Sequence, residues 1–174
     1  MAIQPILHYP DPRLAEVCAP VERFDDELRS FIADLEETMR AGPGGVGIAA
    51  PQVGRLIRVS VVDVSSKPDV KHHGRVVLVN PEILEWDGFA VGREGCMSVP
   101  DYTGNVIRAE RIRLTAQDET GAAHEYAMEG YEARAVQHEI DHLDGLLFLD
   151  RLVSRRNDLF RRKVYQEPKA PKKD

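Results

Sequence analysis

Residues 137–145 read Gln-His-Glu-Ile-Asp-His-Leu-Asp-Gly, which places two histidines four positions apart with a glutamate directly after the first. On a helix, residues four apart lie one above the other on the same face, so His138 and His142 can bind one metal ion. The carboxylate of Glu139 would lie beside that ion, where it can carry a proton. Two imidazoles leave a four-coordinate site incomplete, so another segment must supply a ligand.

The third ligand is more easily found upstream of this helix than downstream. Two known zinc-peptidase patterns place a later histidine or glutamate in the site, but Phe148 stands at the histidine position. The only later glutamate, Glu167, precedes a proline in the charged end of the chain. Upstream, Cys96 in Glu-Gly-Cys-Met-Ser offers a thiolate, a strong ligand that would leave a fourth position for water. Alternatively, the histidines form only ordinary hydrogen bonds, because His-Glu-x-x-His also arises by chance.

A third segment, residues 45–54, reads Gly-Val-Gly-Ile-Ala-Ala-Pro-Gln-Val-Gly. Its small residues would let a substrate backbone approach closely. The side-chain amide of Gln52 could donate a hydrogen bond to a developing oxyanion. Taken alone, this stretch is equally typical of an ordinary turn with a surface glutamine.

The elements that must position these segments follow from hydrophobic spacing. Asp25 or Asp26 can cap a helix whose apolar stripe runs from Leu28 to Met39, and Gly145 suits the end of a helix over residues 132–143. Short runs that favour strands occupy residues 58–65, 75–80, 110–117 and 123–128. We also expect a last helix over residues 152–164 and a disordered, charged tail over residues 168–174. The order of elements predicts an α+β fold, with residues 1–167 as a single compact domain.

Composition narrows the class of protein. The chain has 174 residues, of which 43% are hydrophobic and 30% charged, and no apolar run is long enough to span a membrane. Neither a signal peptide nor a disulfide framework is evident, so we expect a cytoplasmic protein, with Cys18 as a small buried residue. Net charge is +6 from Arg151 onward and therefore −12 before it, which argues against sequence-specific nucleic-acid binding but leaves a basic C-terminal end.

The three chemical segments together resemble peptide deformylase. That family carries Gly-x-Gly-x-Ala-Ala-x-Gln, Glu-Gly-Cys-x-Ser and Gln-His-Glu-x-Asp-His in this order, and the chain matches them at residues 45–52, 94–98 and 137–142. The resemblance implies removal of the N-formyl group from the formylmethionine of nascent polypeptides, with release of formate. It also implies Fe²⁺ as the native ion, with Ni²⁺, Co²⁺ or Zn²⁺ possible, and antiparallel sheets around a central metal-bearing helix.

The resemblance assigns roles to individual residues. Cys96, His138 and His142 would bind the metal, and Glu139 would transfer the proton. Gln52 and the backbone N–H of Met97 would stabilise the oxyanion. Five further residues would bind the substrate: Val46, Gly47 and Gly95 through their backbones, and Tyr131 and Ala135 beside the methionine side chain.

Some positions depart from the family pattern, and others lie next to the expected metal ligands. Met97 replaces the commonest leucine, Thr103 stands where some members have arginine, and Tyr131 and Arg134 replace aliphatic residues on the metal helix. An ion pair between Glu94 and Arg108 could support the segment that carries Cys96. Asp141 could also support the metal ligands, but it is equally compatible with an exposed carboxylate on the helix.

Two other functions remain compatible with these residues. One is a zinc peptidase of another type, although its downstream ligand is missing. The other is a non-catalytic, metal-stabilised domain that docks on the ribosome through the basic C-terminal helix. The family resemblance also suggests contact with the ribosome, so a deformylase and a docking domain differ only in whether they catalyse the release of formate.

Overall fold

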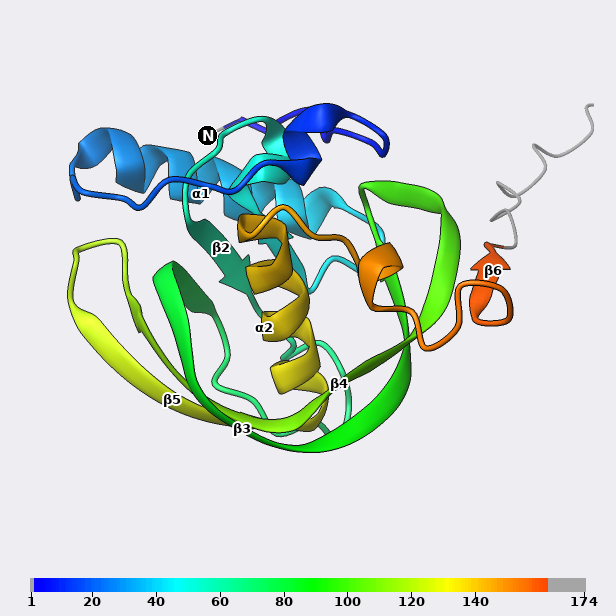
Figure 1. The fold of residues 1–174 in the computed structure, drawn as a ribbon. Coiled ribbons are helices and arrows are strands. Elements are labelled where there is room, and N and C mark those ends of the chain that lie inside the picture. Colours follow the sequence, from blue (N-terminus) through cyan, green and yellow to red (C-terminus); the bar gives the residue numbers. More distant parts are fainter. Residues whose placement is uncertain (1, 163–174) are drawn as a thin grey trace, which may run out of the picture.

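The computed structural model describes residues 2–162, which form two α-helices and one antiparallel sheet (Figure 1). Helix α1 spans Asp26–Ala41 and α2 spans Gly130–Leu143. The strands are listed in chain order: β1 Gly47–Ala49, β2 Val59–Val62, β3 Val76–Cys96, β4 Val99–Gln117, β5 Ala123–Glu129 and β6 Leu159–Arg161. The strand order is β1-β2-β3-β4-β5, and β6 pairs with β4 beside this path.

The two long strands β3 and β4 form a hairpin that curves around α2 (Figure 1). Their register shifts near Val79, Ile83 and Gly95, and such irregularities increase local bending and twist. Only Met97 and Ser98 lie between the two strands, so the tight end of the hairpin places Cys96 at the last position of β3. The hairpin thereby brings a strand residue to the helix that carries the histidines.

Helix α2 is held against the concave face of the sheet by apolar packing. Its residues Ala133, Val136 and Ile140 share a buried cluster with β2, β3 and β4 residues such as Leu78 and Leu114. Helix α1 covers another part of the sheet through a second cluster that includes Ile32 and Leu35. The first cluster therefore fixes α2 on the sheet, and the second fixes α1 on it.

The predicted helices over the first part of the chain and over the metal site are confirmed. Asp25 caps α1, because its carboxylate accepts a hydrogen bond of 3.0 Å from the Leu28 N–H. Helix α2 begins two residues earlier than predicted, and Gly145 adopts a left-handed conformation (φ +76°) just after it. All four predicted strand regions are present, and the antiparallel α+β architecture is confirmed.

The extent of β3 and β4 was underestimated. Most residues in the segment 81–95 of β3 are exposed or only partly buried, and five of them are charged, so the segment lacks the alternation expected of a half-buried strand. The segment is nevertheless a strand, because it pairs along its length with β4, the other arm of the hairpin. Pairing between the two strands, rather than the preferences of the individual residues, decides this part of the fold.

The predicted C-terminal helix is wrong for residues 152–162. The structure has a short 3₁₀ helix at Phe148–Arg151 and then β6, whose residues pair with Tyr102–Gly104 of β4. Val153, Ser154 and Asn157 favour a helix only weakly, whereas the exposed edge of β4 offers unpaired backbone groups. Residues 163–174, which include the end of that helix and the predicted tail, lie outside the described residues.

None of the helices in the described part of the chain is long and apolar enough to cross a membrane. Cys18 is 3% exposed and packs with Ala49 and Leu143, as expected of a small buried residue. Burial raises the pKa of its thiol to about 11, so the thiol stays protonated.

Candidate metal centre and active site

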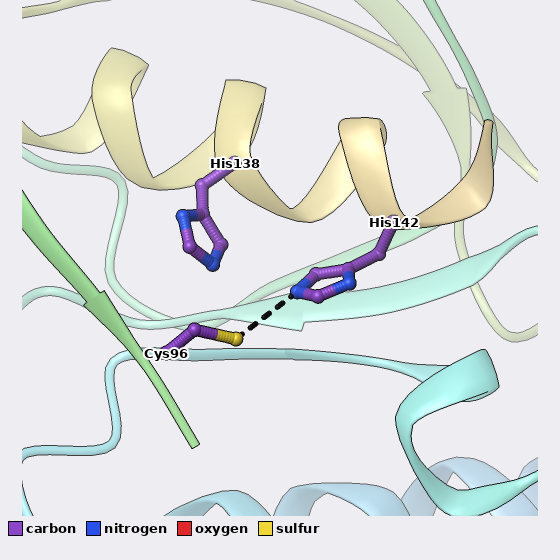
Figure 2. A group of neighbouring side chains, drawn as sticks. All are labelled: Cys96, His138 and His142. Carbon is purple, nitrogen blue, oxygen red and sulfur yellow. Dashed lines mark hydrogen bonds between the residues drawn. The ribbon is translucent and has the colours of Figure 1, made fainter. Parts of the chain in front are cut away.

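The three predicted metal ligands come together in the folded chain (Figure 2). His138 and His142 project from one face of α2, and Cys96 reaches them from the end of β3. The ligand atoms of all three lie within 4.8 Å of one another, and Cys96 Sγ is 3.4 Å from His142 Nε2. All three side chains are buried.

This donor set fits a divalent metal ion. One ion bound at about 2.0–2.3 Å by sulfur and nitrogen would hold tetrahedral ligands roughly 3.5 Å apart, which agrees with the sulfur–nitrogen separation of 3.4 Å. A buried oxygen of the neighbouring Glu139, Oε2, has no hydrogen-bond partner among the described residues. A buried polar atom without a partner is costly unless another species completes its bonding.

Glu94 orients the first histidine of the site. Its Oε1 lies 2.8 Å from His138 Nδ1, which leaves Nε2 of that ring for the metal centre. The same carboxylate accepts two hydrogen bonds of 2.9 Å from Arg108 and one of 2.7 Å from Arg134. Burial would raise the pKa of Glu94, but its bonds to His138 and Arg108 hold that pKa well below its usual range.

The predicted ion pair of Glu94 and Arg108 is therefore present, and Asp141 extends it. Arg108 donates to Asp141 at 2.6 Å, and Asp141 is buried rather than exposed on its helix. Arg151 binds the other side of Asp141 at 3.1 Å. The guanidinium of Arg108 is thus shared between two carboxylates from β3 and α2, inside a region that excludes water.

Arg134 has a different place from the one that its sequence position suggested. Instead of only lining a methionine pocket, it binds Glu94 and also donates to the backbone carbonyls of Ala90 and Val106, at 2.8 and 3.0 Å. Gly92 makes room for it, since a Cβ there would come within 2.9 Å of the guanidinium carbon. Arg134 therefore ties α2 to both arms of the hairpin.

Glu139 lies on the other side of the metal centre, against strand β1. A Cβ on Gly47 would be 2.7 Å from Glu139 Oε1, so a glycine is needed for this side chain to lie where it does. Burial raises the pKa of Glu139 to about 7. A carboxylate with that pKa can both accept and release a proton near neutral pH.

The amide of Gln52 is held in one orientation. Its Oε1 accepts a hydrogen bond of 3.0 Å from the Ala49 N–H, and its Nε2 donates to Ser98 Oγ at 3.0 Å. The same nitrogen lies 3.5 Å from Cys96 Sγ, so an N–H group faces the metal centre. Ser98 was not identified as a site residue, although its place two positions after the cysteine was a usable signal.

A cavity of about 1250 Å³ opens onto the centre. It is lined by most of the residues proposed from the sequence: Val46, Gly47, Gln52, Gly95, Cys96, Met97, Tyr131, Ala135, His138 and Glu139. His142 is 1% exposed and does not line it. Sequence reasoning missed the residues that β6 contributes, Phe160 and Arg161, and the following Arg162, because a helix was expected there.

Comparisons with known proteins agree with this geometry. The family model described as polypeptide deformylase matches residues 3–158. A peptide deformylase of Alkalilimnicola ehrlichii is 49% identical over 94% of this chain and 90% of its own length. The crystal structure of a peptide deformylase from Legionella pneumophila aligns with a TM-score of 0.82 and 42% identity, covering 89% of this chain and 90% of that one. The peptide deformylase of Ehrlichia chaffeensis in complex with actinonin aligns at 0.83, with 34% identity, 90% of this chain and 92% of that one.

Replacing Arg108 by glutamine should strongly destabilise the protein. The change leaves Glu94 and Asp141 without their shared cation, and breaking a buried ion pair in this way costs about 3–5 kcal/mol. Equilibrium unfolding in urea at constant metal content would measure the loss. The matched control is Arg113→Gln on the same strand, which also removes two carboxylate contacts but lies at the surface. Equal losses in both variants would contradict a special role for the buried network.

Proposed function

This chain belongs to the polypeptide deformylase family, whose members remove the N-formyl group from nascent polypeptides, and we propose that Cys96, His138, His142 and Glu139 carry out this hydrolysis. One observation carries the proposal. A thiolate and two imidazoles converge beside a buried carboxylate at a cavity large enough for a peptide.

Cys96, His138 and His142 would hold the divalent ion, and Glu94 keeps the His138 ring in the orientation that this requires. When bound, the ion supplies a Lewis acid that activates water and polarises the formyl oxygen. The ligands come from two elements, the end of β3 and helix α2, which must keep a fixed relative position. The buried contacts of Arg108 with Glu94 on β3 and Asp141 on α2 maintain that position.

Glu139 would move the proton. Its carboxylate faces the cavity next to His138 and can take a proton from the attacking water. It can then deliver that proton to the amine that leaves when the bond between the formyl carbon and the peptide nitrogen breaks. Its pKa of about 7 suits both steps.

Gln52 and Met97 would stabilise the negative charge that develops on the formyl oxygen. The Ala49 N–H and Ser98 Oγ hold the Gln52 amide, so its nitrogen does not have to reorient during the reaction. The backbone N–H of Met97, next to Cys96, would be the second donor. Loss of one such donor typically costs about 3–4 kcal/mol of transition-state stabilisation.

The substrate would bind as an added strand. Strand β1 pairs only with β2 in the described sheet, so its other edge is available to a peptide backbone near Val46 and Gly47. Gly95, which also lines the cavity, would pair with the same peptide. Tyr131 and Ala135 on α2 would contact the methionine side chain.

Replacing Glu139 by alanine should lower kcat for formate release by about 10²–10⁴-fold, because the proton carrier is lost. Metal content should be unchanged, since Glu139 is not one of the three ligands. Release of formate from a formyl-Met peptide would measure the effect, with the exposed Glu129→Ala as control.

Near-normal turnover in Glu139→Ala would remove this residue from the mechanism. A native protein that cleaves internal peptide bonds but releases no formate would instead support the zinc-peptidase alternative. A metal-loaded protein with neither activity would support a non-catalytic metal domain.

The proposed native ion is Fe²⁺, with Ni²⁺, Co²⁺ or Zn²⁺ able to use the same ligands. Protein purified without oxygen should contain about one iron per chain and lose activity on aeration, because the ferrous ion and its thiolate ligand are both oxidisable. Nickel-loaded protein is the control, and Cys96→Ser should retain less metal. Iron protein that keeps full activity in air would contradict the assignment.

Contact with the ribosome through the basic C-terminal end remains part of the proposal, as does a cytoplasmic location, where nascent chains are made. The contact would involve arginines in the turn before β6 rather than a helix. Arg155 and Arg156 are exposed there. Changing both to glutamate should reduce co-sedimentation with ribosomes in low salt by repelling RNA phosphates. Unchanged co-sedimentation would exclude this turn from the contact.

A further inference from the structure

Three guanidinium groups that line the cavity have no carboxylate partner among the residues that the structure describes. Arg93 on β3, Arg161 on β6 and Arg162 just after it all line the cavity. Within residues 2–162, none of the three forms an ion pair with an acidic side chain. In the described part of the chain, two acidic residues line the cavity: Glu94, whose charge is compensated by Arg108 and Arg134, and Glu139.

Strand β6 places Arg162 directly over the substrate-binding wall. The Arg162 N–H donates to the Asp101 carbonyl at 2.7 Å, which continues the pairing of β6 with β4. The guanidinium then lies over Gly95, where a Cβ would clash with its Nη2. Because Gly95 directly precedes the ligand Cys96, this positive charge lies beside the path of a peptide bound at the metal centre.

Arg93 is held close by through contacts with uncharged groups. Its Nε donates to Asn105 Oδ1 at 3.1 Å, and its Nη1 donates to Thr103 Oγ1 at 3.3 Å. The guanidinium also stacks on the Phe160 ring, with its carbon 3.9 Å from the ring centroid. These contacts orient the side chain and leave its charge uncompensated.

We propose that Arg162, assisted by Arg93, forms a carboxylate-binding subsite for an acidic side chain within the first residues after the formylmethionine. A guanidinium can bind a carboxylate through two parallel hydrogen bonds. The methionine would lie at the α2 end of the cavity, whereas β6 lies at the right-hand edge of the molecule in Figure 1, away from α2. The subsite therefore meets residues downstream of methionine, and it rests on the proposed function.

The charge of the rest of the chain makes this subsite consequential. Residues 1–150 have a net charge of −12, so an acidic peptide is repelled by most of the molecule. The arginines that line the cavity make the electrostatic potential positive where the peptide binds. The enzyme should therefore process nascent chains with early aspartate or glutamate without the penalty that its overall charge would impose.

The test compares formyl-Met peptides that differ only in glutamate, glutamine or lysine at the second, third or fourth position. At low ionic strength, kcat/KM for formate release should be roughly three- to tenfold higher for glutamate than for glutamine at one of these positions. In Arg162→Gln this ratio should fall toward one, and Arg162→Lys should keep part of it. Added salt should reduce the native ratio.

The matched control is Arg23→Gln, an exposed arginine outside the cavity that gives the same change in net charge. In this variant the ratio of kcat/KM for the glutamate peptide to kcat/KM for the glutamine peptide should equal that of the native enzyme. A native ratio of one or less at all three positions, or an undiminished ratio in Arg162→Gln, would overturn the subsite. Turnover of the glutamine peptide tests the deformylase activity separately, so failure of the subsite and failure of the proposed function can be told apart.

Discussion

The structure depends on a charged carboxylate, that of Glu94, buried between the sheet and helix α2. A buried charge is tolerated only when opposite charges and hydrogen bonds surround it. Arg108 supplies two bonds from β4, and Arg134 and His138 each supply one contact from α2. These contacts hold three elements in one arrangement, and the same carboxylate sets the orientation of His138, a candidate metal ligand.

That arrangement explains why a long hairpin is needed around a short helix. The thiol must approach the two imidazoles from outside the helix, and β3 carries it there as the last residue before a tight connection. Apolar packing of Leu78 and Leu114 against α2 brings the elements together. The polar network then selects one relative position, because a shifted helix would leave Glu94 or Asp141 charged and unpaired.

The active site divides into parts with different electrostatic character. Around the metal centre, the ionised Glu94 is fully compensated, and Glu139, whose pKa is raised by burial, lies against Gly47. At the β6 end, the cavity is positively charged because Arg93 and Arg162 meet only neutral groups among the described residues. The chemistry of a deformylase and the environment of the peptide beyond methionine are thus set by different segments of the chain.

The sequence alone identified the family and predicted the candidate metal ligands and proton carrier, because the His-Glu-x-x-His spacing is local to one helix and the cysteine and glutamine lie in short motifs. It also determined α1 and α2, whose caps and apolar stripes are local signals. Only the tertiary structure decided that residues 81–95 extend β3, that Arg134 binds Glu94, and that residues 159–161 form a strand instead of a helix. In each case the stabilising partner lies on another strand or helix, so its backbone or side-chain bonds outweigh weak local preferences only after the two elements have come together.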